Sequence, residues 1–238
     1  MRCVLITGGT DGIGLALVRH YKNAGDRVIV SGRRPPDQLP EDFPSDTFYV
    51  QADQTDIGTV QAVCDAVGDS LDLAILNAGV GFSSDTGAED ERQAGMTLTA
   101  NLDFNILLTH ALFTPLQKRG GKLVLIGSVA HRGAAKFPSY AASKAGLHGF
   151  ARALREEWHG RVKVQIIHPG PTKTAMHAKA GFDTSKMDWM FLAPTWMAGA
   201  IAAAVEQGRP RVTLSHGAWV MSGLRWLDGP LKLRKPTI

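Results

Sequence analysis

The chain has 238 residues, of which 44% are hydrophobic and 20% charged, and its formal net charge is +4. No apolar run approaches the ~20 residues that a membrane-spanning helix needs, and no repeat or low-complexity tract interrupts the sequence. The two cysteines, Cys3 and Cys64, fall in a predicted strand and a predicted helix, as buried thiols do in a reducing compartment. This composition predicts a cytoplasmic globular protein without a disulfide framework, a metal site or a secretory signal.

Seven short apolar runs predict β-strands at residues 2–7, 27–31, 47–51, 73–77, 122–128, 163–168 and 211–215. Helical patterns lie between them, near residues 13–24, 56–67, 96–118, 139–158 and 195–207. Several runs are apolar throughout, as expected for strands that are covered on both faces. The alternation predicts an α/β fold with a doubly wound, parallel, seven-stranded sheet of the Rossmann type, flanked by helices on both faces. We find no linker, so residues 1–238 are expected to form a single domain.

The first predicted strand runs into the glycine-rich stretch TGGTDGIG, Thr7 to Gly14, and a helix follows. In this context glycines allow a tight turn and a close approach of the backbone to a pyrophosphate, which then faces the amides of the helix N-terminus. The spacing Gly-x-x-x-Gly-x-Gly differs from the commoner dinucleotide fingerprint. The alternative interpretation is a glycine turn that serves packing alone.

The second predicted strand ends in VIVSGRR, with Gly32 followed by Arg33 and Arg34. NAD-binding sheets carry a carboxylate at this point, which accepts hydrogen bonds from the adenosine ribose. A carboxylate would repel a 2′-phosphate, whereas a guanidinium binds it with paired, charge-assisted hydrogen bonds. The sequence therefore favours NADP(H) over NAD(H), unless both arginines are solvated loop residues.

The stretch FPSYAASKAG, residues 137–146, places Tyr140 and Lys144 one helical turn apart among small side chains. Such a pair is most often an exposed tyrosine beside a solvated lysine. It can also be an acid–base pair, because a nearby ammonium stabilises a phenolate and so lowers the pKa of the tyrosine. The rest of the sequence decides between these two interpretations.

In its order of motifs the sequence resembles the classical short-chain dehydrogenase/reductase family, over residues 2 to about 176. The glycine motif is followed by Asp53 in QADQTD, an Asn-Ala-Gly after the fourth strand, a helix asparagine, a serine after the fifth strand, the Tyr-x-x-x-Lys pair and HPGPTKT after the sixth strand. The resemblance implies a catalytic set made of Asn101, Ser128, Tyr140 and Lys144. With the two arginines, it implies cofactor contacts at Gly8, Thr10, Asp11, Gly12, Ile13, Gly14, Arg33, Arg34, Asp53, Gln54, Asn77, Ala78, Gly79, Tyr140, Lys144, Pro169, Gly170, Thr172 and Thr174.

The resemblance also implies a role for each catalytic residue. Tyr140 would exchange a proton with the substrate oxygen, and Ser128 would hydrogen-bond that oxygen. Lys144 would bind the nicotinamide ribose and lower the pKa of Tyr140, while Asn101 would hold a water that links Lys144 to solvent. Two alternatives stay open: Asn101 as a buried amide bonded to the backbone, and Ser128 as a cap of its strand.

The chain departs from the family in two places. Ser128 precedes Tyr140 by 12 residues, one fewer than the commonest spacing, so we expect a tightened loop between them. The end of the chain, residues 216–238, is an atypical basic tail. From Gly208 onward the sequence contains six lysines and arginines and only one acidic residue. A basic tail can favour anionic membranes, nucleic acid or acidic substrates, or simply be solvated.

Residues 177–196 fall where the family has its substrate loop, and they carry the large apolar side chains of Phe182, Met187, Trp189, Met190 and Phe191. Such a segment either closes over a hydrophobic ligand or packs on its own core or on another subunit. These observations predict an NADP(H)-dependent oxidoreductase that interconverts a ketone or aldehyde and an alcohol, with a small-molecule substrate and no nucleic-acid partner. A homodimer or homotetramer is expected from the resemblance. The alternative is a catalytically silent nicotinamide-nucleotide sensor or scaffold.

Overall fold

The computed structural model of the chain describes residues 1–84, 89–174 and 191–215. Within them the strands are β1 (Cys3–Thr7), β2 (Arg27–Gly32), β3 (Phe48–Gln51), β4 (Leu73–Leu76), β5 (Lys122–Ile126), β6 (Lys163–Pro169) and β7 (Arg211–Leu214). They form one seven-stranded sheet in the order β3-β2-β1-β4-β5-β6-β7, and every pair is parallel. The predicted fold class is confirmed.

In the described residues, longer helices and four short helical turns connect the strands. The helices are α1 (Gly12–Asn23), α2 (Val60–Val67), α3 (Glu91–Leu98), α4 (Phe104–Ala111), α5 (Phe113–Arg119), α6 (Pro138–Glu157) and α8 (Pro194–Gln207). The short turns are the 3₁₀ turns η1 (Pro36–Gln38), η2 (Ile57–Thr59) and η4 (Val129–Arg132) and the π-helical turn η3 (Thr99–Asp103).

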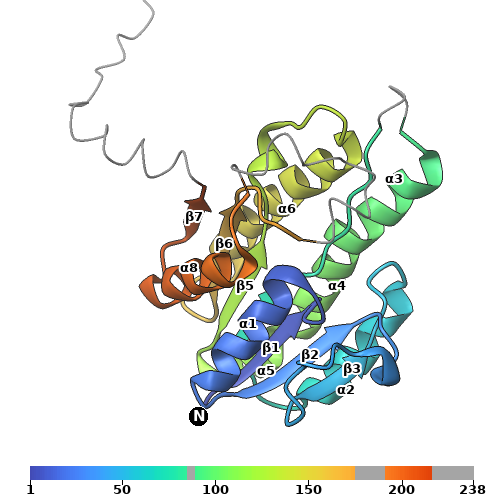
Figure 1. Cartoon of the computed structure of the whole chain (residues 1–238). Helices are drawn as coiled ribbons and strands as arrows, with labels where there is room; N and C mark the ends of the chain where they lie inside the picture. Colours follow the sequence, from blue (N-terminus) through green and yellow to red (C-terminus); the bar gives the residue numbers. More distant parts are fainter. Residues whose placement is uncertain (85–88, 175–190, 216–238) are drawn as a thin grey trace, which may run out of the picture.

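The helices cover both faces of the sheet (Figure 1). Side chains of α1 and α8 pack on one face, while α2, α4, α5 and α6 pack on the other. Successive strand residues alternate between the two cores, so Leu5 belongs to one core and Ile6 to the other. This two-sided burial explains the uninterrupted apolar runs of the sequence.

Two predicted helices differ from the observed ones. The helix predicted over 96–118 begins earlier, at Glu91, because the Asp90 side chain caps it by accepting a hydrogen bond from the Gln93 amide at 2.8 Å. It is then interrupted by η3, and α4 ends at Ala111 because Pro115 has no amide hydrogen to donate to the Ala111 carbonyl. The helix predicted over 56–67 begins at Val60, after a separate 3₁₀ turn.

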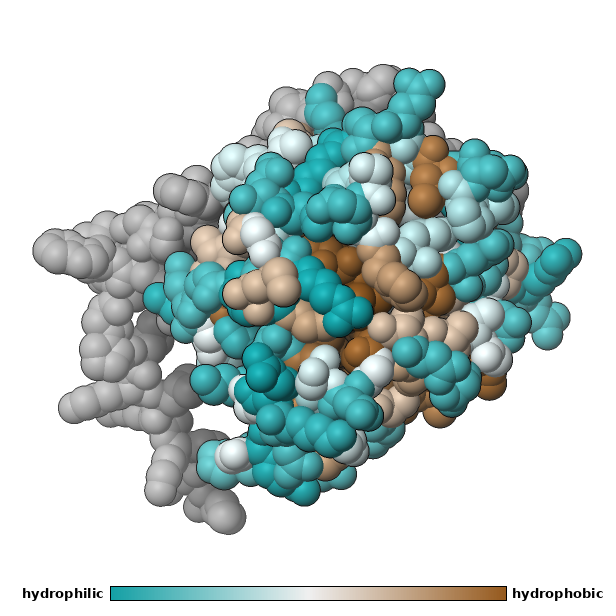
Figure 2. All heavy atoms as spheres, turned by 90° about the horizontal axis from the view of Figure 1, so that it is seen from below, coloured by the Kyte–Doolittle hydropathy of each residue, from teal (hydrophilic) through white to brown (hydrophobic). Residues whose placement is uncertain are grey.

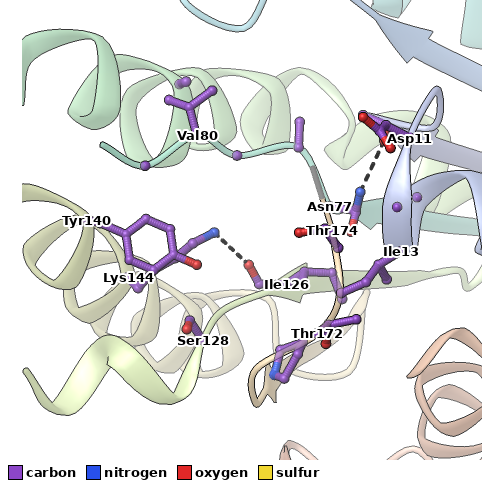
Figure 3. Close-up of a pocket in the computed structure, with 18 of the residues that line it drawn as sticks. Asp11, Ile13, Asn77, Val80, Ile126, Ser128, Tyr140, Lys144, Thr172 and Thr174 are labelled. Atoms are coloured by element: carbon purple, nitrogen blue, oxygen red, sulfur yellow. Dashed lines mark hydrogen bonds between the residues drawn. The ribbon is translucent and has the colours of Figure 1, made fainter. Parts of the chain in front are cut away.

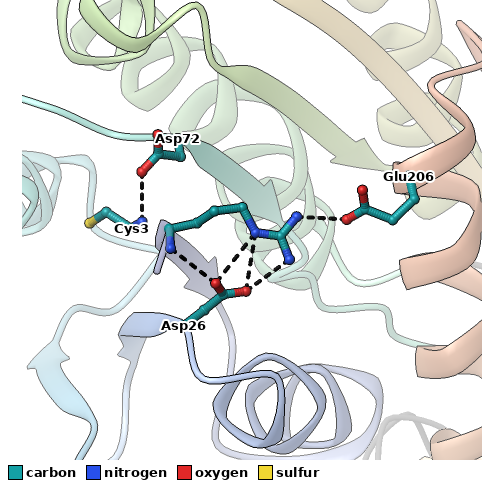
Figure 4. Close-up of polar contacts among 5 residues, drawn as sticks. Cys3, Asp26, Asp72 and Glu206 are labelled. Atoms are coloured by element: carbon teal, nitrogen blue, oxygen red, sulfur yellow. Dashed lines mark hydrogen bonds and ion pairs between the residues drawn. The ribbon is translucent and has the colours of Figure 1, made fainter.

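A polar network joins the start of the chain to distant elements (Figure 4). The Arg2 guanidinium contacts Asp26, before β2, at 2.8 Å and Glu206, on α8, at 2.7 Å. Asp26 also accepts a hydrogen bond from the Arg2 backbone amide, and Asp72 accepts one from the Cys3 amide. At this end of the molecule, hydrophobic side chains gather in the middle and hydrophilic ones surround them (Figure 2). Because Arg2 and Asp26 directly precede β1 and β2, the network lies at the edge where the strands begin, away from their carboxyl ends.

The sheet order places β1 and β4 side by side in its middle, where the chain changes direction along the sheet. In open parallel sheets a ligand crevice forms at the carboxyl ends of the strands at such a point. The predicted substrate-loop region, 177–196, lies mostly outside the described residues, and the predicted basic tail, 216–238, lies wholly outside them. The division into one domain with these two segments stays a prediction.

Candidate active site

A cavity of about 480 Å³ opens at the carboxyl ends of the strands. All the cofactor residues predicted from the sequence line it, and so does Ser128. Asn101 does not line it, although its neighbour Ala100 does. The fold therefore brings motifs from seven separate parts of the sequence to one cavity.

The glycine turn forms the wall beside the start of α1. A β-carbon on Gly14 would lie 2.0 Å from the Gly8 carbonyl oxygen, so only glycine fits there. Asn77, after β4, stabilises this turn, because its side-chain amide donates to the carbonyls of Thr7 and Gly8 at 3.1 and 3.3 Å. The hydroxyl of Thr7 in turn accepts hydrogen bonds from the amides of Asn77 and Ala78. The turn is thereby fixed with the first amides of α1 at the cavity, an arrangement suited to a diphosphate.

The end of β2 forms the far wall. A β-carbon at position 32 would lie 2.9 Å from the methyl carbon of Thr10, so any side chain there, a carboxylate included, would force Thr10 to shift. The Tyr49 hydroxyl donates to the Gly32 and Arg34 carbonyls and so fixes the turn that carries both arginines. Arg33 is exposed, and the guanidinium of Arg34 lies 3.5 Å from Asp11. Two cations thus border this end of the cavity.

Asp53 and Gln54 follow β3 in the same wall. The Asp53 carboxylate accepts hydrogen bonds from the amide and the hydroxyl of Thr55, both at 2.9 Å, which fixes the loop. The side chain of Gln54 is buried, and its Nε2 atom has no hydrogen-bond partner among the residues that the structure describes. A buried donor without a partner is costly, so a ligand that accepts a hydrogen bond would stabilise this position.

Tyr140 and Lys144 project from α6 into the opposite part of the cavity (Figure 3). Lys144 is 3% exposed, and its ammonium donates to the Ile126 carbonyl at 3.0 Å. The same nitrogen lies 5.7 Å from the centre of the Tyr140 ring. Burial lowers the pKa of Lys144 to about 8. The lysine is therefore positioned by the end of β5 as much as by its own helix.

The pKa of Tyr140 differs from the expectation. Burial raises it above the ordinary value, and a hydrogen bond with Ser128 opposes this shift. The residue lines the open cavity and is only partly covered, yet it lies deep enough for desolvation to outweigh the effect of Ser128. Without a bound cofactor, Tyr140 is therefore a neutral phenol at pH 7, able to donate a proton.

Ser128 lies just after β5 and begins η4, and its hydroxyl accepts a hydrogen bond from the Ala130 amide at 3.1 Å. The serine thus caps the turn that follows it and not the end of its strand, while the residue still lines the cavity. The short connection to Tyr140 contains two residues with left-handed backbone, Gly133 (φ 114°) and Lys136 (φ 68°). This tightening accommodates the 12-residue spacing.

Asn101 lies in η3 and is fully buried. Its side chain accepts a hydrogen bond from the Val80 amide and donates to the Val80 carbonyl, both at 2.8 Å, and it also contacts Ser143. The backbone carbonyl of Asn101 accepts a hydrogen bond from the Asn105 side chain at 2.9 Å. The side chain therefore matches the interpretation of a buried amide bonded to backbone, and the water-holding role stays a prediction.

Several residues near the cavity are not part of the motifs, although Phe191 belongs to the predicted substrate-loop region, 177–196. The aromatic side chains of Phe82, Phe137 and Phe191 line its substrate end. Glu89 hydrogen-bonds Ser139, next to Tyr140. They belong to segments that meet only in the folded chain, so spacing along the sequence does not reveal them.

Three histidines, His131, His148 and His168, meet behind Ser128. His168 is fully buried, and burial lowers its pKa to about 3. Burial also lowers the pKa of His148. The rings of these two residues are therefore neutral at pH 7, and no pattern along the sequence predicts that they meet.

Comparison with known proteins agrees with this geometry. The family model for the short chain dehydrogenases matches residues 2–184. An uncharacterised oxidoreductase of Myxococcus xanthus is 31% identical over 192 residues, which cover 76% of each chain. The 3-oxoacyl-[acyl-carrier-protein] reductase MabA of Mycobacterium bovis is 30% identical over 181 residues, which cover 74% of this chain and 71% of MabA.

Among solved structures, a short chain dehydrogenase from Burkholderia cenocepacia in complex with NADP shares the fold. Its TM-score is 0.80 at 24% identity, and the match covers 95% of this chain and 93% of that one. The match of the family model over most of the sequence, and the order of the motifs around one cavity, lead to one conclusion: this chain belongs to the short-chain dehydrogenase/reductase family.

Proposed function

We propose that this protein is an NADP(H)-dependent oxidoreductase that interconverts an alcohol and a ketone or aldehyde, and that it works as a reductase. One observation carries the proposal: Ser128, Tyr140 and Lys144 line the same cavity as the glycine turn and the two arginines. Family membership supports dehydrogenase/reductase chemistry. The complete set of acid–base residues favours turnover over the sensor interpretation.

The cavity has the features that NADP(H) requires. The glycine turn and the start of α1 would hold the diphosphate, and the unpartnered Nε2 of Gln54 would donate to the adenine ring. Arg33 and Arg34 would bind the 2′-phosphate, and Gly32 provides no carboxylate that would repel it. NADP and NADPH complexes of proteins with the same fold are consistent with this preference. The bound nicotinamide would supply the hydride.

The protein residues would handle the proton. Tyr140 is a neutral phenol in the free protein and can donate its proton to the substrate oxygen as hydride adds to the carbonyl carbon. The Ser128 hydroxyl would hydrogen-bond the same oxygen. Lys144 would stabilise the tyrosinate that this transfer leaves, because its ammonium lies near the ring. The raised pKa keeps the proton on Tyr140 at pH 7, the protonation state from which reduction starts, and this is our reason for the reductive direction.

The substrate end of the cavity favours an apolar carbonyl compound. Phe82, Phe137 and Phe191 come from three separate segments and all line the cavity. Such a wall contributes to binding by burial of apolar surface, whereas Ser128 and Tyr140 orient the polar oxygen. Aliphatic ketones, aromatic aldehydes and 3-oxoacyl thioesters are the first classes to test.

We also propose a homo-oligomer in a reducing compartment, the cytoplasm. Leu107, on α4, is 44% exposed, and Leu98, on α3, is 38% exposed. Exposed leucines on this helical layer favour pairing with a second copy. Both cysteines are free thiols. Within the described residues, no helix combines the length and the apolar character needed to cross a membrane.

A screen of carbonyl compounds that follows the absorbance of NADPH tests the proposed activity. At least one apolar ketone or aldehyde should be reduced by the wild type, and the Tyr140→Phe protein serves as the control for non-enzymatic oxidation. If no compound is reduced although NADPH binds, the reductase proposal fails and the sensor interpretation is favoured.

A further inference from the structure

The cluster of His131, His148 and His168 offers three imidazole nitrogens that lie within 4.8 Å of one another. The three residues come from η4, α6 and the end of β6. None of them lines the cavity, so the proposed reaction does not use them. From this juxtaposition we propose a binding site for a divalent transition-metal ion such as Zn²⁺, separate from the cofactor cavity.

Hydrogen bonds determine which nitrogens are available. The Ser128 carbonyl only accepts hydrogen bonds, so the His168 Nδ1 atom, 3.1 Å away, carries the proton. The Nε2 atom of the neutral His168 ring therefore carries a lone pair, and it faces His148 Nδ1 at 3.0 Å. A metal-binding histidine commonly donates its other ring N–H to a backbone carbonyl, which fixes the orientation of the ring. His168 already has this partner.

The distances are close to those of a metal site. With zinc–nitrogen bonds of about 2.0–2.1 Å, two ligands of a tetrahedral ion lie roughly 3.3 Å apart. His148 Nδ1 and His168 Nε2 need to separate by only a few tenths of an ångström, and the proton of His148 Nδ1 moves to its Nε2. The ligand stays neutral, so no charge is created on the protein.

His131 has to move further. Its ring stacks on that of His168, with centroids 4.0 Å apart and planes 21° apart, so its lone pair must turn toward the ion. His131 and His148 are half-buried, which gives an ion access from outside and leaves room for a water as the fourth ligand. Imidazole ligands suit Zn²⁺, Ni²⁺ and Cu²⁺, whereas Mg²⁺ and Ca²⁺ prefer oxygen.

The positive charge around the cluster repels a divalent cation and so limits the affinity of the site for the metal ion. Arg152, Arg155 and Arg211 lie near enough to act on His148. Within the described residues, no aspartate or glutamate belongs to the cluster. Binding therefore rests on the three nitrogens, and the loss of any one should be measurable.

Isothermal titration of the full chain with ZnCl₂ tests the site, in the absence of NADP(H) because phosphates bind divalent ions. We expect one saturable site that Mg²⁺ does not compete for. His148→Asn and His168→Asn should each weaken it at least about tenfold. His159→Asn, on the exposed turn after α6, is the matched control and should bind like the wild type.

The full chain has eight histidines, two of them, His177 and His216, outside the described residues. The double variant His177→Gln/His216→Gln should keep the wild-type affinity. Co²⁺ bound to the wild type should show the visible bands of a tetrahedral nitrogen site. Circular dichroism confirms that each variant is folded, and His148→Asn, a half-buried helical position, remains informative if His168→Asn does not fold. The proposal is overturned if the wild type shows no saturable site, or if folded His148→Asn protein binds as tightly as the wild type.

Discussion

The carboxylate of Glu89 accepts hydrogen bonds from both the backbone amide and the hydroxyl of Ser139, the residue before Tyr140. Ser139 lies in the first turn of α6, where the helix leaves amides without an intrahelical partner. Glu89 therefore caps the helix that carries Tyr140 and Lys144, from a segment that lies fifty residues earlier in the sequence. An anion at this end is also stabilised by the helix dipole.

Replacing Glu89 by glutamine should lower the free energy of unfolding by about 1 kcal/mol, because the cap loses its charge. Urea denaturation measures this change. Glu41→Gln, at an exposed loop position, is the control and should leave the stability within about 0.5 kcal/mol of the wild type. Equal stabilities of the two variants would show that Glu89 does not act as a cap.

NADPH should bind at least tenfold more tightly than NADH, a difference of about 1.4 kcal/mol, because Arg33 and Arg34 border the ribose end of the cavity. Arg33→Ala should weaken NADPH far more than NADH. Arg27→Ala, exposed at the opposite end of β2, should change neither affinity. Fluorescence titration of both cofactors gives the result, and equal affinities in the wild type would refute the preference.

Removing the Tyr140 hydroxyl with Tyr140→Phe should lower kcat by about 10²–10⁴, the loss expected for a positioned general acid. The dissociation constant of NADPH should stay nearly unchanged, because the glycine turn, Arg33 and Lys144 remain. Lys144→Ala should impair both quantities, since this residue is proposed to bind the ribose and to stabilise the tyrosinate. A Tyr140→Phe protein that keeps most of its kcat would exclude the mechanism.

The buried ammonium of Lys144 should make the cofactor-free protein gain stability as the pH rises. Its pKa is about 8 in the folded state and about 10.5 in the unfolded chain, so the unfolded chain binds more protons between these values, and stability rises with pH there. Burial of the Lys144 ammonium lowers the free energy of unfolding by roughly 3 kcal/mol at pH 7. About 2 kcal/mol of this loss should disappear by pH 9.5.

Lys144→Met removes this dependence while it keeps an apolar stem of similar length. Urea denaturation of both proteins from pH 7 to 9.5 isolates the contribution of Lys144, because other titrating groups are common to both. The wild type should gain stability relative to the variant over this range. A constant difference would mean that the ammonium is not desolvated in the folded protein.

Placing a charge on α4 should weaken self-association. Leu107→Glu puts a carboxylate at a position that is 44% exposed in the single chain, so it should shift the protein toward monomer without unfolding it. Phe48→Glu, on β3 at the edge of the sheet, is the control with a 53% exposed aromatic residue. Light scattering at micromolar concentration measures both, and a monomeric wild type would rule out the oligomer.

The sequence predicts best those features that depend on short spacings. Tyr140 and Lys144 lie one turn apart in a helix, and the glycine turn follows a strand directly, so local geometry determines both arrangements. The parallel sheet with helices on both faces follows from the alternation of buried runs with helices. These features needed no knowledge of distant contacts.

Features that depend on distant contacts were not predictable. The side chain of Asn101 points to Val80 because η3 widens the helix locally, and no residue pattern marks such a turn. The pKa of Tyr140 rises because the fold buries it, whereas the sequence shows only a nearby lysine. The three histidines are separated by 17 and 20 residues and meet only through η4, α6 and β6.

The network of Arg2, Asp26 and Glu206 has a consequence for how the protein is made in the cell. Arg2 and Glu206 are separated by 204 positions, so a ribosome synthesises nearly all of the described chain before this ion pair can form. Until then, the face of the sheet on which α8 packs exposes apolar side chains, including Ile167 of β6. Nascent chains that stall before α8 emerges should therefore be substrates for chaperones, which bind such exposed surface.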